Sequence, residues 1–365
     1  MFKIIISMWV LFIMAFTLNA KENLTLEKKI GQMLMVGFHG TSALPKSQIC
    51  KDIKKYNLGA VILFDYNPVN RKKPKNIATK RQLAQLTKQL QACSHDGKLL
   101  IAVDQEGGRV QRLKHKYGFY GKFPKASDVV KMDQSQIYNT YKKMSKELKS
   151  VGINYDLAPV VDLDINKKNH VIHGLGRSFG KEPKLVAKYA STFIDAMHSN
   201  GVLTSLKHFP GHGSSVGDTH KGFVDVTNLW KKVELEPYRL LKNRADTVMV
   251  AHVFNKKIDA KYPATLSKKT VDGLLRKKLG YKGVVITDDL QMGAISKKYG
   301  LKSTLKLAIN AGDDILLIGN QLDPRKVISS KVLVDTIVSL VKFGVVKVER
   351  INSAYRRIQK LKQKL

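Results

Sequence analysis

Three histidines and an aspartate lie close together near the middle of the chain. Segment 207–213 reads Lys-His-Phe-Pro-Gly-His-Gly, and Asp218-Thr219-His220 follows a few residues later. The proline and glycines exclude the helical i, i+4 spacing of common zinc motifs and indicate a loop. In an extended loop Asp218 and His220 point to the same side, where the carboxylate can orient the imidazole and raise its basicity. Three interpretations stay open: acid/base catalysis from a loop, a metal site, or histidines with a structural role.

Two further segments place carboxylates where they could do chemistry. Segment 104–112, Asp-Gln-Glu-Gly-Gly-Arg-Val-Gln-Arg, combines acceptors and forked donors that suit sugar hydroxyls, although a solvated turn explains it equally well. Segment 286–293 places Asp288 between an apolar run and a helix-like stretch. An aspartate in that position is either a helix N-cap or a nucleophile aimed into a pocket.

The elements that must position these residues are short apolar runs, each followed by an amphipathic stretch. Segments 81–92 and 268–279 are typical of such helices, and 348–365 of a closing basic helix. Eight strand–helix repeats predict an α/β protein with a single (β/α)8 TIM barrel, with an open doubly wound sheet as the alternative. The eight runs have the length and composition of strands covered on both faces: 33–38, 60–64, 99–104, 154–159, 203–207, 247–252, 284–288 and 315–319.

Polar side chains gather at the C-terminal ends of the predicted strands. Asp104, Lys207 with His208, His252 and Asp288 all occupy such positions. In a barrel that face carries the chemistry, so residues from several strands should converge above one central pocket. The long segments after strands three, four and five are expected to build the site.

The first twenty residues differ from the rest of the chain. Lys3 gives a positive start, and residues 4–18 are almost unbroken apolar sequence. This run is short for a membrane span of roughly 20 residues but has the proportions of a secretory signal. We therefore expect a signal peptide at 1–20, cleaved near Ala20, and a catalytic domain at 21–365. Because Leu18 stands where a smaller residue is usual, an uncleaved anchor is the alternative. With a signal peptide, we expect the protein to be periplasmic or secreted.

The chain is strongly basic, with 64 Lys and Arg against 29 Asp and Glu and a net charge of +35. The cations are spread in short clusters such as Arg71-Lys72-Lys73, and no arginine-rich arm or aromatic-interleaved basic run occurs. A dedicated nucleic-acid module is therefore excluded. The charge predicts a weak, general attraction to anionic envelope polymers.

The chain has two cysteines, Cys50 and Cys93. Two cysteines cannot build a metal site or a disulfide framework by themselves. They could pair in an oxidising compartment, but we expect two buried free thiols.

Taken together, the motifs resemble the β-N-acetylglucosaminidases of glycoside hydrolase family 3, in the single-domain NagZ type. The resemblance rests on 104–112, on 207–213 with its trailing Asp-x-His, and on 286–292, in the same order over roughly residues 25–320. Gly176-Arg177-Ser178-Phe179 and Ala251-His252-Val253 also fit.

The resemblance implies a role for each matching position. Asp288 matches the family nucleophile, His220 its general acid/base, and Asp218 the partner of that histidine. Many relatives carry a second domain that supplies a carboxylic acid as the proton donor. In this sequence the resemblance gives that role to the loop histidine. The export signal departs from the cytosolic recycling enzymes of this type. No metal and no organic cofactor is implied. The residues that match those holding the terminal sugar are Asp104, Arg112, Arg177, Lys207 and His208.

We accordingly expect a retaining β-N-acetylhexosaminidase that releases terminal β-linked N-acetylglucosamine from peptidoglycan fragments through a glycosyl-aspartate. Alternatives within the family are a β-glucosidase or β-xylosidase and a β-N-acetylglucosaminide phosphorylase. An alternative of another class is a non-catalytic binder of anionic wall polymers. The expected partner is a carbohydrate rather than a nucleic acid, and the expected state is a monomer.

Overall fold

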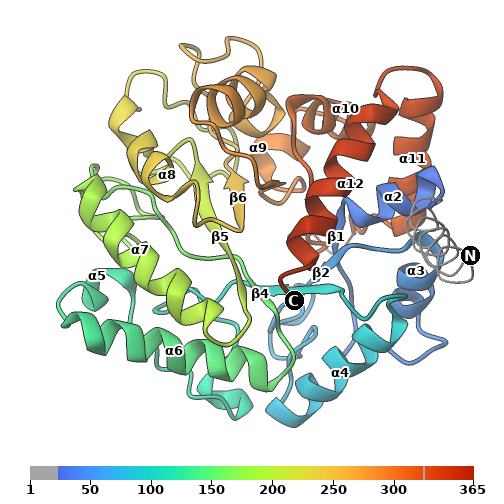
Figure 1. Cartoon of the computed structure of the whole chain (residues 1–365), viewed down its shortest axis with the longest axis horizontal. Coiled ribbons are helices and arrows are strands. Elements are labelled where there is room, and N and C mark those ends of the chain that lie inside the picture. Colours follow the sequence, from blue (N-terminus) through green and yellow to red (C-terminus); the bar gives the residue numbers. More distant parts are fainter. Residues whose placement is uncertain (1–23, 324) are drawn as a thin grey trace, which may run out of the picture.

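Eight short parallel strands form the centre of the computed structural model, which describes residues 24–323 and 325–365 (Figure 1). Consecutive strands pair from β1 to β7, and β1 also pairs with β8. A parallel bridge between Ile286 and Ile315 joins β7 to β8 and closes the sheet. The predicted (β/α)8 barrel is thus confirmed. The strands are β1 Leu34–Gly37, β2 Ala60–Ile62, β3 Leu100–Val103, β4 Tyr155–Asp156, β5 Leu203–Phe209, β6 Thr247–Val250, β7 Val284–Thr287 and β8 Leu316–Ile318.

All eight strands lie inside or across the predicted segments, but their lengths differ from the prediction. β4 keeps only two residues of the predicted 154–159. The chain then runs irregularly beside β5: the carbonyl oxygens of Ala158 and Pro159 accept from the N–H groups of Ser205 and Lys207, and a bridge joins Val160 to Lys207. Pro159 itself has no N–H to donate to a regular ladder. β5 instead runs two residues further than predicted, to Phe209.

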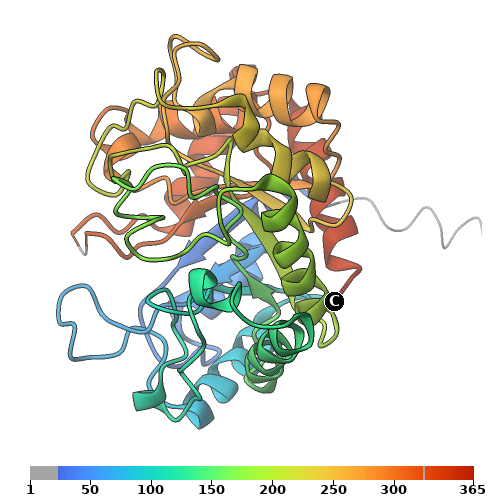
Figure 2. The same ribbon diagram turned by 90° about the vertical axis from the view of Figure 1, so that its left-hand side faces the viewer.

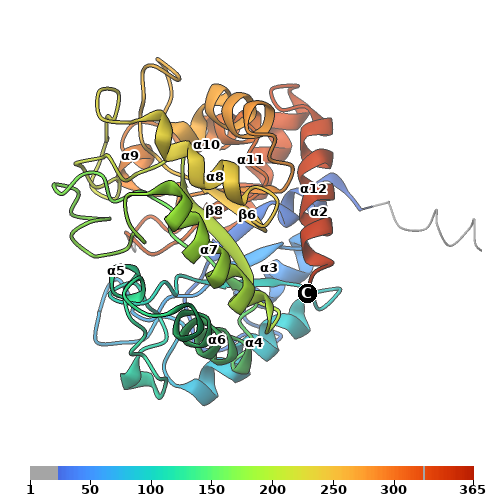
Figure 3. The ribbon, with the colours of Figure 1, turned by 60° about the vertical axis from the view of Figure 1, so that its left-hand side comes forward.

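The helices form an outer ring around the strands (Figure 1). The predicted helices at 81–92, 268–279 and 348–365 are present as α4, η4 and α12, and η4 has π-helical hydrogen bonding. α12 packs against α2 beside the barrel (Figure 3). The helical elements are α2 Leu26–Gln32, α3 Gln48–Tyr56, α4 Lys80–Cys93, η1 His115–Tyr117, α5 Ala126–Val129, α6 Gln134–Ser150, α7 Pro183–His198, η2 Lys232–Leu235, α8 Glu236–Leu241, η3 Ala264–Leu266, η4 Lys269–Lys278, α9 Gly293–Ser296, α10 Leu301–Ala311, α11 Ser330–Lys342 and α12 Val348–Lys362.

Local sequence sets where these helices begin. Thr79 accepts a hydrogen bond from the backbone N–H of Gln82 and starts α4. Asp133 and Gln136 form a reciprocal capping box at the start of α6. Such side-chain caps satisfy backbone donors that have no partner inside the helix.

Long connections follow β3, β4 and β5, as the sequence predicted. Figure 2 shows the loops that follow the strands on one side of the molecule, opposite the C-terminus. The strand residues between the two ends of the barrel are buried. The barrel thus has a packed interior and one face built from loops, which is where active sites lie in this fold.

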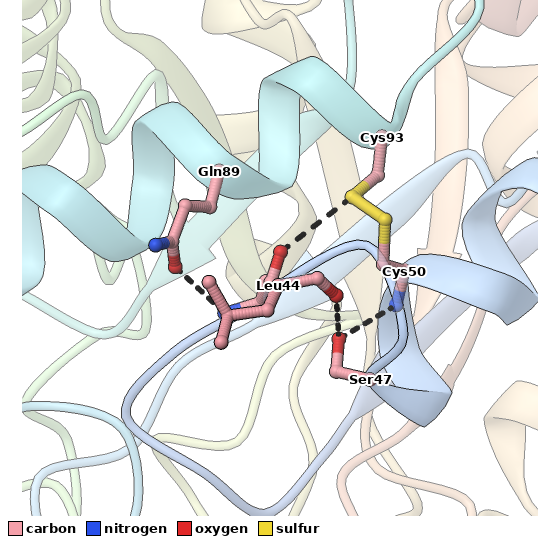
Figure 4. Close-up of a disulfide and its surroundings, with 6 residues drawn as sticks. Leu44, Ser47, Cys50, Gln89 and Cys93 are labelled. Carbon is pink, nitrogen blue, oxygen red and sulfur yellow. Dashed lines mark hydrogen bonds between the residues drawn. A yellow bond between two sulfur atoms is a disulfide. The ribbon is translucent and has the colours of Figure 1, made fainter.

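Cys50 and Cys93 form a disulfide bond, with their Cα atoms 5.3 Å apart (Figure 4). The expectation of two free thiols was therefore wrong. The bond links α3 to the end of α4, two helices that pack against each other on the outside of the barrel. The two cysteines are 43 residues apart in sequence. Their pairing depends on the packing of two helices, which spacing alone does not reveal.

The predicted signal peptide at 1–20 lies outside the described residues and stays a prediction. Within residues 24–323 and 325–365, each helix is too short or too polar to cross a bilayer.

Candidate active site

A cavity of about 320 Å³ opens at the C-terminal end of the barrel. Apolar side chains from the strand ends, among them Ile62, Leu157 and Met249, form part of its wall. The cavity therefore combines apolar walls with convergent polar groups, the usual composition of a small-molecule site. All eight residues that the sequence predicted for the site line it: Asp104, Arg112, Arg177, Lys207, His208, Asp218, His220 and Asp288.

Lys207 lies at the centre of a buried charge cluster. Its Nζ donates to Asp104 Oδ1 at 2.9 Å and contacts Glu106 Oε1 at 2.7 Å. The second oxygen of Asp104 accepts from Arg112 Nη2 at 3.3 Å. Burial would raise the pKa of Asp104, but the charges of Lys207 and Arg112 outweigh it and hold that pKa below its ordinary value. Asp104 is thus an ionised acceptor at the cavity wall.

Arg177 reaches the same cluster from the loop after β4. Its Nε and Nη2 donate to the two oxygens of Glu106 at 2.8 and 2.7 Å. Against the effect of burial, the Arg177 guanidinium and the Lys207 ammonium lower the pKa of Glu106. Glu106 was not among the predicted site residues, although it lies inside segment 104–112. Its role is to hold two of the predicted binding cations in one place.

His208 is oriented by a second carboxylate that the sequence prediction missed. Its Nδ1 lies 2.7 Å from Asp162 Oδ2, and the backbone N–H of His212 donates to the other oxygen of Asp162 at 2.7 Å. Nε2 of His208 lies 3.4 Å from Arg177 Nη2. Asp162 stands on the irregular chain after β4, outside every motif that the sequence displayed.

The histidines of the β5 loop have separate partners. His212 Nδ1 lies 2.7 Å from Ser215 Oγ, and burial lowers the pKa of His212 to about 4, so its imidazole is neutral. His208 faces Asp162, and His220 faces Asp218. In the described part of the chain, no three His, Cys, Asp or Glu side chains are grouped as metal ligands. Each imidazole thus has its own side-chain partner, although the rings of His208 and His212 lie beside each other, with centroids 5.9 Å apart.

Asp288 follows β7 directly and is partly buried in the cavity wall. Burial would raise its pKa, but the imidazoles of His252, His208 and His220 outweigh that effect and lower it. The backbone N–H of Asp289 also donates to Asp288 Oδ1 at 2.8 Å. Asp288 is therefore a carboxylate that stays ionised in the cavity wall.

The neighbouring carboxyl group has a different environment. Asp289 Oδ1 accepts from the backbone N–H groups of Gln291 and Gly319, both at 3.1 Å. Burial, aided by the negative charge of Asp288, raises the pKa of Asp289 to about 6 despite these bonds. Both acids line the cavity, but they differ in their contacts: Asp288 accepts one backbone bond from its neighbour, whereas Asp289 ties the β7 loop to the β8 loop.

His252 supports this region from β6. It is fully buried, with Nδ1 2.8 Å from Thr265 Oγ1 and Nε2 2.9 Å from the carbonyl oxygen of Asp289. Burial lowers the pKa of His252 below its ordinary value. The imidazole thus fixes the backbone beside Asp288.

His220 and Asp218 pair at the mouth of the cavity, 2.9 Å apart between Nδ1 and Oδ1. The His220 side chain is 55% exposed. Its loop is fastened to the start of α9: the backbone N–H of Gly293 donates to the His220 carbonyl oxygen at 3.2 Å, and that of Ala294 donates to Thr219. A Cβ on Gly293 would lie 2.8 Å from the same oxygen, so the glycine permits the contact. The element that follows Asp288 therefore positions the loop of His220.

A sequence model of one protein family matches nearly the whole described chain and thereby identifies its family. The sequence model described as "Glycosyl hydrolase family 3 N terminal domain" matches residues 25–361. The chain belongs to glycosyl hydrolase family 3. This confirms the family that the motifs resemble.

Individual relatives agree with this assignment. Beta-hexosaminidase A of Pseudoalteromonas piscicida is 32% identical over 388 residues, which cover 95% of this chain and 62% of that protein. A beta-hexosaminidase of Xylella fastidiosa strain M23 is 32% identical over 300 residues, covering 78% of this chain and 83% of the relative. The chain thus spans less than two thirds of the first protein and most of the second.

Solved structures share the fold. A family 3 beta-N-acetylglucosaminidase from Paenibacillus sp. str. FPU-7 has a TM-score of 0.83 at 34% identity, covering 94% of this chain and 63% of that one. A beta-N-acetylhexosaminidase from Beutenbergia cavernae has a TM-score of 0.81 at 30% identity, and the match covers 93% of this chain and 99% of that one. Relatives of this barrel therefore occur both with and without a long additional part.

Proposed function

We propose that this chain is a retaining β-N-acetylhexosaminidase that releases terminal β-linked N-acetylglucosamine through a covalent glycosyl-aspartate. One observation carries the proposal: an ionised carboxylate, Asp288, and an imidazole–carboxylate pair, His220 with Asp218, line the same cavity from different elements. A nucleophile and a proton donor in one site are what double displacement at an anomeric carbon requires. The names of the relatives from Pseudoalteromonas, Xylella and Paenibacillus support the same activity.

The assignment of Asp288 as the nucleophile follows from the contrast with Asp289. Asp288 is kept ionised by the surrounding imidazoles, whereas burial raises the pKa of Asp289 to about 6 and two backbone N–H groups occupy it. Environments that separate the pKa values of two neighbouring acids separate their roles. In the first step an oxygen of Asp288 bonds to the anomeric carbon as the glycosidic bond breaks.

His220 supplies and then removes the proton. Its imidazolium gives a proton to the departing oxygen, and the neutral ring later takes one from the water that releases Asp288. Imidazole can do both near neutral pH. A neutral base also avoids a second anion beside the nucleophile. Asp218, which accepts from both the ring and the backbone N–H of His220, holds the ring in position.

The buried charge cluster is proposed to hold the terminal sugar. Asp104 offers carboxylate oxygens, and Lys207, Arg177 and Arg112 offer N–H donors, a mixture that matches the alternating donors and acceptors of sugar hydroxyls. Glu106 and Asp162 keep the cations and His208 in place. No step in this scheme requires a metal or an organic cofactor.

A substrate panel tests the function. Aryl β-glycosides of N-acetylglucosamine, glucose and xylose should be turned over with the first strongly preferred, and peptidoglycan disaccharides are the proposed natural substrates. Rates with and without phosphate separate hydrolysis from phosphorolysis. Preference for glucose or xylose, or a rate that depends on phosphate, would replace the proposal by the corresponding activity. Absence of turnover with every glycoside would favour a binder of wall polymers.

We further propose that the protein acts outside the cytoplasm. The predicted signal at 1–20 and the disulfide between Cys50 and Cys93 both support this, because disulfides persist mainly in oxidising compartments. N-terminal sequencing of the protein from its native cells should find a start near Lys21. Met1 on a soluble cytosolic product would refute export.

A further inference from the structure

The loop after β2, residues 65–74 and here called the rim loop, extends from the catalytic face of the barrel. Figure 2 shows it in blue at the lower left, on the same side as the other strand-end loops. Backbone bonds close it into an ordered lobe: the N–H of Asn67 donates to the Lys73 carbonyl oxygen, and that of Lys73 to Asn70, both at 2.9 Å. Its tip carries three consecutive exposed cations, Arg71, Lys72 and Lys73.

These cations are not balanced by acids. Asp65 is the only acid in the rim loop, and it is buried against Lys114, whose Nζ lies 2.6 Å from Asp65 Oδ2. None of the three tip cations forms an ion pair within residues 24–323 and 325–365. The loop therefore presents a local positive charge that is available to an anion.

The rim loop is also part of the cavity mouth. Tyr66 lines the cavity, and its carbonyl oxygen accepts from Gln321 Nε2 of the β8 loop at 3.0 Å. The Arg71 guanidinium lies over the Tyr66 ring, 5.3 Å from its centroid. Arg71 is thereby joined to the cavity through one aromatic side chain, a contact that suits a guanidinium, and Lys72 and Lys73 follow it directly in the sequence.

Burial distinguishes the deep end of the cavity from its mouth. The side chains of Lys207 and Glu106 are 3% and 7% exposed, whereas Leu322, which lines the cavity together with Tyr66, is 43% exposed. If the buried cluster holds the terminal sugar, the rest of the substrate must leave through the mouth. The group at the rim is then the leaving group.

We propose that the rim loop binds a carboxylate on the leaving-group side of the substrate, so that Arg71, Lys72 and Lys73 make the enzyme prefer anionic aglycones. This inference rests on the proposed function and adds a specificity determinant to it. An exposed cation cluster contributes mainly electrostatic attraction, which salt weakens. The preference should therefore be modest in size and sensitive to ionic strength.

A pair of matched substrates tests the proposal. The first is N-acetylglucosamine β-1,4-linked to N-acetylmuramic acid, with its free lactyl carboxylate, and the second is the same disaccharide with a carboxamide. At low salt the wild type should favour the carboxylate in kcat/KM by about five- to tenfold, and about 0.5 M salt should remove most of this preference. The R71Q/K72Q/K73Q variant should cleave both at nearly the carboxamide rate.

A control variant separates the position of the charges from their number. K51Q/K54Q/K55Q removes three exposed cations from α3 on the outer ring and should keep the wild-type preference. Loss of the preference in both variants would mean that the total positive charge of the protein causes it. An equal fall in kcat/KM for both substrates in the rim variant would mean that these residues have a structural role. Either result would overturn the proposal, as would a wild type that does not discriminate.

A binding measurement keeps this inference separate from the proposed function. Calorimetry with N-acetylmuramic acid and its carboxamide requires no turnover. Wild type should bind the acid more tightly than the amide, and the rim variant should bind the two alike. Equal affinities in the wild type would contradict a carboxylate site. Turnover of an aryl β-N-acetylglucosaminide, measured separately, decides whether the glycosidase assignment holds.

Discussion

One oxygen of Asp218 lies 2.9 Å from both the Nδ1 and the backbone nitrogen of His220. The carboxylate therefore fixes the ring relative to its own backbone. Burial would raise the pKa of Asp218, but these bonds and the nearby imidazole lower it. In the proposed mechanism Nδ1–H donates to this anion, and Nε2 is the nitrogen that exchanges protons with substrate and water.

Replacing His220 by alanine should separate good from poor leaving groups. A poor leaving group needs a proton as it departs, so its hydrolysis should fall by about two to four orders of magnitude. An activated aryl group leaves without help, so the glycosyl-enzyme should form readily and then accumulate because no base activates water. The dependence of rate on leaving-group pKa, measured for wild type and His220→Ala, checks this expectation.

Asp218→Asn is the matched partner of that experiment. The imidazole remains but is no longer held by a charged group, so a smaller loss is expected, about ten- to a hundredfold. If His220→Ala slows good and poor leaving groups equally and no intermediate builds up, another residue is the acid/base.

Zinc analysis of wild type and of the His208, His212 and His220 variants tests the metal interpretation, which requires stoichiometric zinc that these changes remove.

Asp288→Ala should lower turnover by several orders of magnitude with the fold intact, because covalent catalysis is lost. A fluorosugar substrate that is turned over slowly should leave a mass adduct on the wild-type peptide containing Asp288, and none on the variant. Unchanged thermal unfolding of the variant serves as the control for folding. An adduct located on Asp289 or Asp104 would overturn the assignment.

The barrel could be predicted because its evidence is local and repeated. Eight apolar runs alternate with amphipathic stretches, and each run needs only a few residues to be recognised. Strand lengths were harder to predict from the sequence: β4 ends early at an irregular stretch before Pro159, while β5 extends to Phe209. The disulfide was missed because it depends on how α3 and α4 pack, and the sequence spacing of Cys50 and Cys93 carries no record of that packing.

The predicted site residues all lie in one cavity because the motifs stand at strand ends, which a barrel gathers on one face. What the sequence did not reveal are the residues that support them. Asp162 lies in no motif and is recognised only by its contact with His208. Glu106 could have been found, since it lies two residues after Asp104 in the same segment. The docking of the His220 loop on Gly293 is a contact between distant parts of the chain.

The disulfide should stabilise the barrel measurably. It closes a loop between residues 43 apart in sequence, and the chain-entropy account gives about 4 kcal/mol for a loop of that size. The double variant with alanine at positions 50 and 93 should lose stability by this order in urea unfolding, and reducing agent should destabilise the wild type but not the variant. Thiol titration of the denatured, unreduced wild type should find no free thiol. Two titratable thiols would show that the bond does not form in solution.

A last prediction concerns a buried acid beneath the loop that follows β5. Glu234 is 1% exposed and accepts from the backbone N–H groups of Ser214 and Lys231, both at 3.2 Å. Gly211 of the loop lies so close that a Cβ there would be 2.5 Å from the Cβ of Glu234. Burial raises the pKa of Glu234 from 4.5 to about 7, despite these hydrogen bonds.

This shift fixes how the stability of the protein should depend on pH. Between about pH 4.5 and 7 the folded state keeps the proton of Glu234 while the unfolded state loses it, so this group lowers the free energy of unfolding as pH rises. The loss amounts to about 3 kcal/mol in total and is complete above pH 7. Glu234→Gln cannot ionise, so its melting temperature relative to wild type should increase from pH 4.5 to 7 and then stay level. Thermal unfolding of both proteins across this range isolates the one carboxyl, because every other titration is shared. A difference that does not change with pH, or that decreases, would show that Glu234 is ionised in the folded protein throughout the range.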